Sequence, residues 1–313
     1  MGLLLAFATA LAAALVLTPL AKRVSFALGV LDHPGPLKVQ RQPVAYLGGI
    51  AVLGALAVGI APSHAAWLIP LALATALGVA DDVRAISPQI RLVAQFSIGC
   101  VAGIVDPAPG RLGFLVTALG VVLLVNAVNL IDGMDGLAAS VVAISAIGFA
   151  LLGAHVALPA LALCGALLGF LVYNRPPARI YLGDGGSYLL GTALALLAAR
   201  ALEGQGGAAW IALPLLVGLP LADTAITIVR RARNGKPLLA GDRSHVYDQL
   251  ADRKWSCVRV LIVCCAIQAA AVGAGVVSWR LDIAAAATLA VACVAVAVAA
   301  VWKFDLVTER AVA

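Results

Sequence analysis

Long apolar runs separated by short polar breaks fill the chain from end to end. A transmembrane helix needs about 20 apolar residues, and on that scale the pattern predicts about eleven helices. They fall near residues 3–20, 45–61, 65–80, 91–105, 112–131, 137–154, 156–173, 187–202, 208–229, 258–278 and 282–302. The pattern therefore predicts an all-α fold, a polytopic transmembrane helical bundle that forms a single domain over residues 1–313.

Composition changes this picture only by excluding alternatives. Of 313 residues, 63% are hydrophobic and 12% are charged, and the mean hydropathy is +1.05. A soluble domain of this length does not need so much apolar surface. The six cysteines lie nearly all within apolar runs and lack the spacing of a metal site, so we expect them to pack inside the bundle.

Lysine and arginine set the expected orientation. If successive polar breaks alternate between the two sides of the membrane, all but three of the 21 basic residues fall on one side, the exceptions being Arg111, Arg200 and Arg280. The positive-inside rule makes the crowded side cytoplasmic. We therefore expect a multi-pass protein of the cytoplasmic (inner) membrane, with the N-terminus outside, the C-terminus inside and the active site at the cytoplasmic face.

The pair Asp81-Asp82 ends one apolar run at that face. Two adjacent carboxylates repel each other, and a divalent cation or a proton relieves the repulsion. The alternative is ordinary solvation of a helix end, with Arg84 as a local partner. Arg91, at the start of the next span, is either a positive-inside anchor or a phosphate ligand.

The richest polar break runs from Asn126 to Gly136. Asn126 and Asn129 are three residues apart and share a helix face, whereas Gly133 and Gly136 disfavour a continuous helix. We expect the helix to end near residue 130, before a turn that presents two carboxylates, Asp132 and Asp135. A capped turn alone would leave both asparagines unexplained, so we interpret the segment as part of a metal and phosphate site.

The segment from Asn174 to Ser187 has similar chemistry. Its glycines allow the backbone to approach a ligand closely, and Asp184 is a hard oxygen ligand suited to Mg²⁺ or Mn²⁺. We expect the next helix to begin just after it, with free amides turned toward a bound anion. The segment is not a P-loop, because no Gly-Lys-Ser/Thr follows.

The hydrophilic stretch 230–257 contains Arg243 and His245, which suit a diphosphate group. The alternative is a basic loop that rests on anionic lipid headgroups. Asp223, late in the 208–229 span, is an intramembrane acid, and we expect it to pair with Arg230 or Arg231.

Together these motifs resemble the polyprenyl-phosphate N-acetylhexosamine-1-phosphate transferases of glycosyltransferase family 4, over about residues 29–250. The matching stretches are Asp32-His-Pro34, Gly48-Gly49, Asp81-Asp82, Asn126-x-x-Asn129-x-x-Asp132-Gly-x-Asp135-Gly, Asn174 and Gly183-Asp184-x-Gly-Ser187. The resemblance implies transfer of a sugar 1-phosphate, GlcNAc-1-phosphate foremost, from a UDP-sugar to polyprenyl (undecaprenyl) phosphate. UMP would be released, and the lipid-linked sugar would start a cell-envelope glycan.

The resemblance also implies a role for each matching residue. Asn129 and Asp184 would bind Mg²⁺, or Mn²⁺ in its place. The catalytic residues would be Asp81, Asp82, Arg91 and His245. The substrate-binding residues would be Lys38, Asn126, Asp132, Gly133, Asp135, Asn174 and Arg243. The implied partners are UDP-N-acetylhexosamine, a polyprenyl phosphate lipid and a second copy in a homodimer, and no nucleic acid.

One motif departs from the family pattern. Tyr247 and Asp248 stand where the family usually has histidines, so that only His245 remains. This counts against the branch that transfers phospho-N-acetylmuramoyl-pentapeptide in peptidoglycan synthesis, which stays the alternative substrate. The rivals from other classes are a transporter, which needs deep polar residues and broken helices in matching halves, and a non-catalytic lipid-binding protein, which needs no paired carboxylates.

Overall fold

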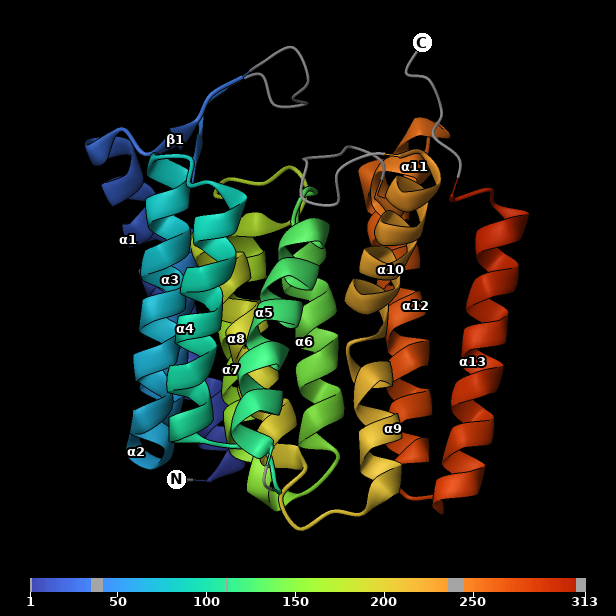
Figure 1. Ribbon diagram of the computed structural model, residues 1–313. Coiled ribbons are helices and arrows are strands. Elements are labelled where there is room, and N and C mark those ends of the chain that lie inside the picture. The colour runs from blue at the N-terminus through green and yellow to red at the C-terminus, as the bar shows by residue number, and fades with distance from the viewer. Residues whose placement is uncertain (1, 35–41, 111, 236–244, 308–313) are drawn as a thin grey trace.

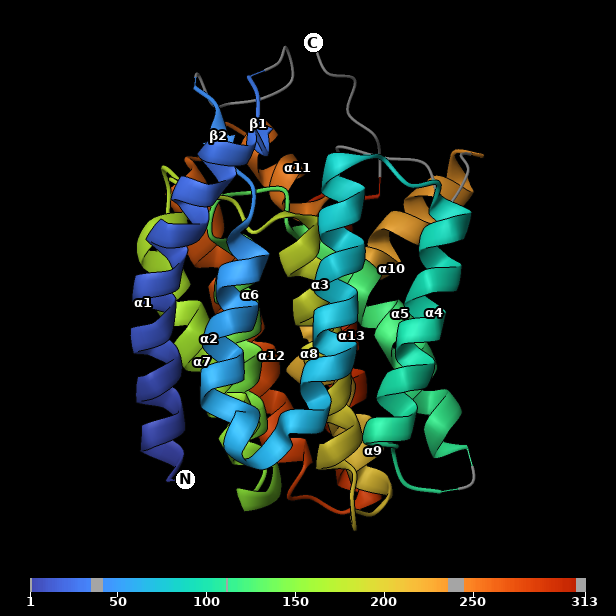
Figure 2. The ribbon, with the colours of Figure 1, turned by 90° about the vertical axis from the view of Figure 1, so that its left-hand side faces the viewer.

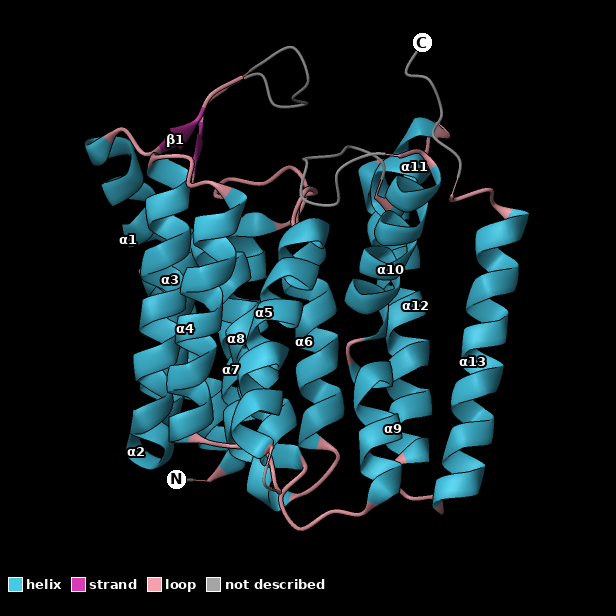
Figure 3. Ribbon diagram, viewed as in Figure 1, coloured by secondary structure: helices cyan, strands magenta, loops and turns pink. Residues whose placement is uncertain are grey.

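The computed structural model describes residues 2–34, 42–110, 112–235 and 245–307, and these form a helical bundle with one small hairpin (Figure 1, Figure 3). Lys38 and Arg243 lie outside the described residues. The elements are α1 (Leu3–Leu28), β1 (Leu31–Asp32), β2 (Val44–Ala45), α2 (Gly48–His64), the 3₁₀ turn η1 (Ala65–Trp67), α3 (Leu68–Val83), α4 (Pro88–Val105), α5 (Gly113–Ile131), α6 (Leu137–Ala150), α7 (Ala154–Asn174), α8 (Gly183–Ala201), α9 (Gly207–Leu216), α10 (Gly218–Arg233), α11 (Val246–Asp252), α12 (Cys257–Ser278) and α13 (Ile283–Lys303).

Every predicted apolar segment contains a helix, so the all-α prediction is confirmed. Seven stretches of the described residues are long and apolar enough to cross a membrane, or eight if the bent pair α9–α10 is one span. One of the seven, Gly48–Val83, contains both α2 and α3. Figure 2 shows that the chain reverses direction at η1, so that these two helices run antiparallel.

The predicted single span at 208–229 is wrong in one respect, because the structure breaks it into α9 and α10 with a bend of 78°. Pro220 lacks an N–H, so it cannot bond the Leu216 carbonyl four residues earlier. The buried carboxamide of Gln268 on α12 takes over this bond: its Nε2 donates to the Leu216 oxygen (2.8 Å), while its Oε1 accepts from Leu219 N (2.9 Å). Gln268 Nε2 also donates to Ser145 Oγ (3.0 Å) on α6.

Helix α8 forms the centre of the bundle, packed mainly against α3 and α5 and buried along almost its whole length. Gly78 on α3 is needed for this packing, because a Cβ there would overlap the backbone carbonyl of Asp184. Close contact between the two backbones places the carboxyl end of α3 beside the first turn of α8.

The β1–β2 hairpin joins the segment after α1 to the segment before α8. Leu31 pairs with Ala45 in antiparallel register, and Ala45 forms a parallel bridge to Ile180. Tyr181 N donates to the Ala45 carbonyl (2.8 Å), and Gly48 N donates to the Tyr181 carbonyl (3.1 Å). The hairpin therefore holds the start of α2 against the loop that leads into α8, at the same end of the bundle as the candidate site.

Candidate functional site

Asp81, in the last turn of α3, is almost fully enclosed by hydrogen-bond donors. Its Oδ2 accepts from Arg91 Nη1 (2.9 Å) and from the Tyr188 hydroxyl (2.8 Å), and its Oδ1 accepts from Ile86 N (2.7 Å). Arg91 therefore makes an ion pair with Asp81, and Arg84, the alternative partner, is exposed at the end of the helix. The pair joins α3 to α4, and Tyr188 adds α8.

Asp82 caps the amino end of α8. Its carboxylate accepts from Asp184 N (3.0 Å) and Gly185 N (3.2 Å). The expectation that the amides of this helix are free for a bound anion is therefore wrong, because the chain supplies its own anion there. A helix starting at Gly183, rather than just after Ser187, explains the difference, since it turns these two amides toward α3.

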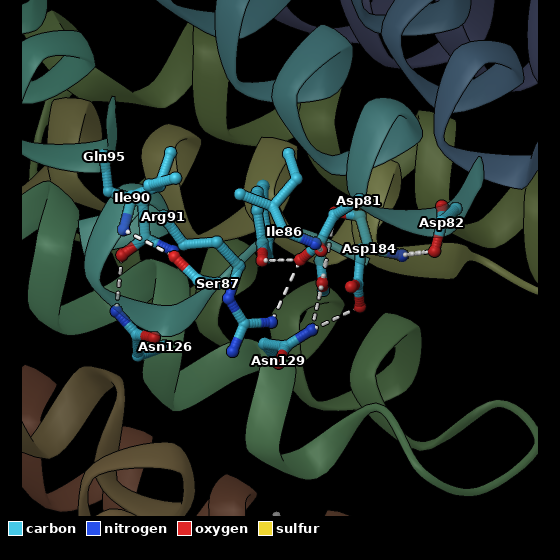
Figure 4. A network of polar contacts seen from close by, with 12 residues as sticks. Asp81, Asp82, Ile86, Ser87, Ile90, Arg91, Gln95, Asn126, Asn129 and Asp184 are labelled. Atoms are coloured by element: carbon cyan, nitrogen blue, oxygen red, sulfur yellow. Dashed lines mark hydrogen bonds and ion pairs between the residues drawn. The ribbon is translucent and has the colours of Figure 1, made fainter. Parts of the chain in front are cut away.

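Asn129 and Asp184, the predicted metal ligands, are in contact. Asn129 Nδ2 lies 2.7 Å from Asp184 Oδ1 and 3.0 Å from Ser187 Oγ. Figure 4 shows the side chains of Asp81, Arg91, Asn129 and Asp184 directed toward one another from four helices. Residues 58 positions apart in the sequence thus share one polar network.

Asp132 adds a further acid beside this network. It directly follows α5, which ends at Ile131 as the turn signals predict. Burial and then the charges of Asp184 and Asp82 raise the pKa of Asp132 well above its usual range. Clustered carboxylates that disfavour each other's charge are the environment in which a divalent cation is stabilised.

The donor set fits Mg²⁺ or Mn²⁺, which prefer oxygen ligands. Asp184 and Asp132 supply carboxylate oxygens, and Asn129 supplies an amide whose oxygen and nitrogen exchange places by a flip. No group of three or more His, Cys, Asp or Glu side chains in the described part of the chain forms a complete metal cage. Such a partial set is typical of Mg²⁺ sites, where substrate phosphates and water complete the coordination.

The turn from Asp132 to Gly136 is braced by the next polar segment. The buried Asn174 accepts from Gly136 N (3.1 Å) and donates to the Ile180 carbonyl (2.9 Å). Asp135 Oδ2 accepts from Ala178 N (2.9 Å), and burial raises the pKa of this carboxyl. In this structure both side chains hold the two loops together.

Asn126 does not reach the carboxylates, although it shares a helix face with Asn129. Its Nδ2 donates to Gln95 Oε1 (2.6 Å) and to the Val122 carbonyl (2.7 Å). Sequence reasoning missed Gln95 and Tyr188, and it gave no role to Ser187, although Ser187 lies in one of the matching stretches. Gln95 follows Arg91 by four residues on α4, a spacing that places both on one helix face and offered the only signal.

His245 directly precedes α11 and contacts a different set of partners. Its Nδ1 lies 2.7 Å from Asp223 Oδ2, so the expected pairing of Asp223 with Arg230 or Arg231 is replaced by a carboxylate–histidine pair. The ring of His245 stacks on Tyr247, with centroids 5.7 Å apart and planes 12° apart. Asp248 Oδ2 accepts from His245 N (3.3 Å) and so caps α11.

Tyr247 links His245 to the carboxylate cluster. Its hydroxyl lies against Gly133, where a Cβ would overlap the phenolic oxygen. Gly133 is thus required for contact between α11 and the Asp132–Gly136 turn, and the two family departures, Tyr247 and Asp248, both have local roles. His245 is therefore placed at the edge of the site, through Tyr247.

An apolar groove of about 550 Å³ runs along α2 and α3, lined by Ile50, Leu53, Ala72, Thr75, Ala76, Val79, Ala80, Val83 and Arg84. Its α3 residues recur at 72, 75, 76, 79, 80 and 83, which marks one helix face. Asp81 binds Arg91 and Tyr188 from another face. The groove therefore lies on a different face of α3 from Asp81.

The fold and site define a multi-pass helical membrane protein with acids and amides gathered at one end of the bundle. Residues 64–201 match glycosyl transferase family 4. The chain is 32% identical over 277 residues to a probable undecaprenyl-phosphate N-acetylglucosaminyl 1-phosphate transferase of Bacillus subtilis, covering 79% of this chain and 77% of the relative. It is 34% identical over 293 residues to a phospho-N-acetylmuramoyl-pentapeptide-transferase of Synechococcus sp. (80% and 84%). With an undecaprenyl-phosphate alpha-N-acetylglucosaminyl 1-phosphate transferase of Thermotoga maritima the identity is 28% over 255 residues (79% and 81%).

The chain therefore belongs to glycosyl transferase family 4. The relatives' names describe the transfer of a sugar phosphate to a polyprenyl phosphate. The matched region contains the residues of the carboxylate cluster, from Asp81 through Asn129 to Asp184, and leaves His245 outside it.

Proposed function

We propose that this protein transfers GlcNAc-1-phosphate from UDP-GlcNAc to undecaprenyl phosphate and releases UMP. The observation that carries the proposal is the convergence of Asp81, Asp82, Asn129 and Asp184 from three helices at one end of the bundle. The names of the relatives in Bacillus and Thermotoga support this sugar phosphate and this acceptor. The product would start a cell-envelope glycan.

The reaction proposed is a direct displacement at phosphorus. An oxygen of the polyprenyl phosphate forms a bond to the β-phosphorus of the UDP-sugar, while the bond from that phosphorus to the bridging oxygen breaks and UMP leaves with the electron pair. Phosphoryl transfer depends mainly on positioning and charge stabilisation. A phosphate monoester has a second pKa of about 6, so the acceptor needs no strong base near pH 7.

The chain's own groups would divide this work. Asp184 and Asn129, with Asp132 beside them, would hold Mg²⁺ or Mn²⁺, which when bound would neutralise phosphate charge. Asp81 and Arg91 form a fixed ion pair, and the remaining N–H groups of Arg91 suit a phosphate oxygen. Asp82 would hold α8 in place through its cap, and His245 would contact the diphosphate from the α11 side.

The proposed orientation keeps the candidate site in the cytoplasm, where UDP-sugars are made. The start of α1 and the end of α13 lie at opposite ends of the bundle (Figure 1), which supports an odd number of crossings. Counting α2 and α3 separately and α9–α10 as one bent span gives nine crossings, and the proposal adds α6 and α8 to reach the eleven expected from the sequence. The N-terminus would then face outward and the C-terminus the cytoplasm of the inner membrane, with a homodimer as the proposed assembly.

Phospho-N-acetylmuramoyl-pentapeptide is the second candidate donor group, favoured by the 34% identity to the Synechococcus relative. That group is larger and carries a peptide, and Tyr247 rather than histidine borders the turn at Gly133. We place it second for this reason.

A radiochemical or coupled assay of UMP release tests the proposal. Purified protein is supplied with undecaprenyl phosphate, Mg²⁺ and one of a panel of donors that includes UDP-GlcNAc and UDP-MurNAc-pentapeptide. We expect release from UDP-GlcNAc that requires both the lipid and the metal and stops with EDTA. Release without lipid would indicate hydrolysis, and silence across the panel from folded protein would refute the transferase.

A further inference from the structure

A buried carboxylate–histidine pair lies beside the proposed site, and the reaction described so far uses only its histidine. Asp223 is on α10 and is 1% exposed, while His245 precedes α11 and is 4% exposed. Asp223 Oδ2 lies 2.7 Å from His245 Nδ1, and Asp223 Oδ1 accepts from Val246 N at 2.7 Å. Both oxygens of one buried acid are therefore used to hold the first residues of α11.

This arrangement selects one tautomer of His245. A backbone N–H can only donate, so Oδ1 is an acceptor. An ionised carboxylate also accepts at Oδ2, and the short contact there requires a proton on Nδ1. In the neutral ring, Nε2 then bears the lone pair. Thr227 Oγ1, which lies 3.4 Å from Nδ1 and accepts from Arg230 Nη2 (3.4 Å), is on the Nδ1 side as well.

The ring plane is fixed as firmly as the tautomer. It stacks nearly parallel on Tyr247, whose hydroxyl lies against Gly133 in the turn that follows Asp132. Asp132 in turn is close enough to Asp184 for the two charges to interact. A continuous set of contacts thus runs from Asp223 through His245 and Tyr247 to the carboxylate cluster.

We propose that Asp223 is a positioning residue that accepts from His245 Nδ1–H, so that Nε2 is the ring atom from which the protonated ring donates to a diphosphate oxygen. The inference rests on the proposed function for its substrate, but the tautomer itself does not. A protonated His245 would donate from Nε2 to a phosphate oxygen, and the Asp223 carboxylate would stabilise that imidazolium.

The substitution Asp223→Asn tests this because it inverts the tautomer while keeping the shape. Val246 N–H still needs an acceptor, so the single amide oxygen faces Val246 and the NH₂ group faces His245 Nδ1. An NH₂ group only donates, so Nδ1 must now accept and the proton moves to Nε2. Both hydrogen bonds remain, and the fold is expected to persist.

The experiment uses full-length protein labelled with ¹⁵N in its four histidines, with His245→Gln to assign the signal. We expect Nδ1–H in the wild type and Nε2–H in Asp223→Asn, together with a fall in kcat for UMP release of about 10²-fold, the usual scale of a proton-donating or accepting group. KM for UDP-GlcNAc should change much less. The matched control is Asp252→Asn, the same change of charge at an exposed position of α11.

A double variant shows whether Asp223 acts only by positioning His245 or has a role of its own in the reaction. In a His245→Gln background, Asp223→Asn should cost no further activity. Losses that multiply, an unchanged tautomer in Asp223→Asn, or an Nε2–H tautomer in the wild type would each overturn the proposal. If the wild type releases no UMP from any donor, the proposed function fails by itself, while the tautomer measured in the wild type still confirms or refutes the Asp223–His245 pair.

Discussion

Two polar clusters lie at opposite ends of the bundle, and they satisfy their charges in different ways. At the end formed by η1, Asp106 accepts from Trp67 Nε1 (2.9 Å) and lies 3.8 Å from Arg200 Nη1, which also pairs with the exposed Glu203 at 3.1 Å. Each acid there has a partner within the chain. The cluster ties η1, the end of α4 and the end of α8 together.

The cluster at the end of α3 has more acids than cations. Asp81, Asp82, Asp132 and Asp184 have a single basic partner among the described residues, Arg91. The rest of their charge is opposed by backbone and side-chain hydrogen-bond donors, and burial, followed by the charges of Asp184 and Asp82, raises the pKa of Asp132. The contrast teaches that buried polar side chains alone do not indicate a binding site. A cluster with more carboxylates than basic partners does indicate one, because a bound cation would stabilise its negative charge.

The sharpest test of this contrast is one conservative change at each end. Asp184→Asn should lower UMP release by about 10³-fold, the scale of losing one well-placed electrostatic group, because it removes the charge that would hold the metal. Asp106→Asn should leave release near the wild-type rate. Thermal unfolding of both variants checks that they are folded. Equal activity in the two variants would remove the basis for placing the site at Asp184.

A second, smaller difference between the two ends is expected in thermal stability with and without Mg²⁺, and its measurement needs no substrate. At a Mg²⁺ concentration 100 times its Kd, a metal that binds only the folded state stabilises it by about 2.7 kcal/mol. We expect this Mg²⁺-dependent rise in the unfolding midpoint for the wild type and for Asp106→Asn, and its loss in Asp184→Asn. A rise of the same size in Asp184→Asn would show that the cation binds elsewhere.

The smallest expected effect is on stability, and it concerns the cluster around Asp106, at the end of the bundle formed by η1. Trp67→Phe removes the hydrogen bond to Asp106 and should destabilise the protein by about 1 kcal/mol, the usual net value of one such bond. UMP release at a temperature well below unfolding should not change. A loss of activity without a loss of stability would connect this cluster to the reaction and weaken the contrast between the two ends.

The sequence predicted the helices well and the contacts between them unevenly. Apolar runs gave a helix at every expected place, because membrane spans are defined by length and hydropathy. Asn129 and Asp184, which the resemblance to the family grouped as metal ligands, are in contact. The partner of Asp223 was not predicted, since a distance of 22 residues through a polar loop has no periodic signal, and the Asp82 cap depends on the close approach of α3 and α8 at Gly78.

The bend between α9 and α10 is a fixed joint rather than a hinge. Ten helical residues rise about 15 Å, half of a hydrocarbon core of about 30 Å, so the elbow lies near the middle of the bilayer, where an unbonded backbone group costs several kcal/mol. The carboxamide of Gln268 bonds both broken backbone positions and anchors them to α12 and α6. Opening the elbow would break these bonds in lipid. Any movement that brings Asp223 and His245 toward a substrate must therefore carry α9, α10 and α12 together as one rigid piece.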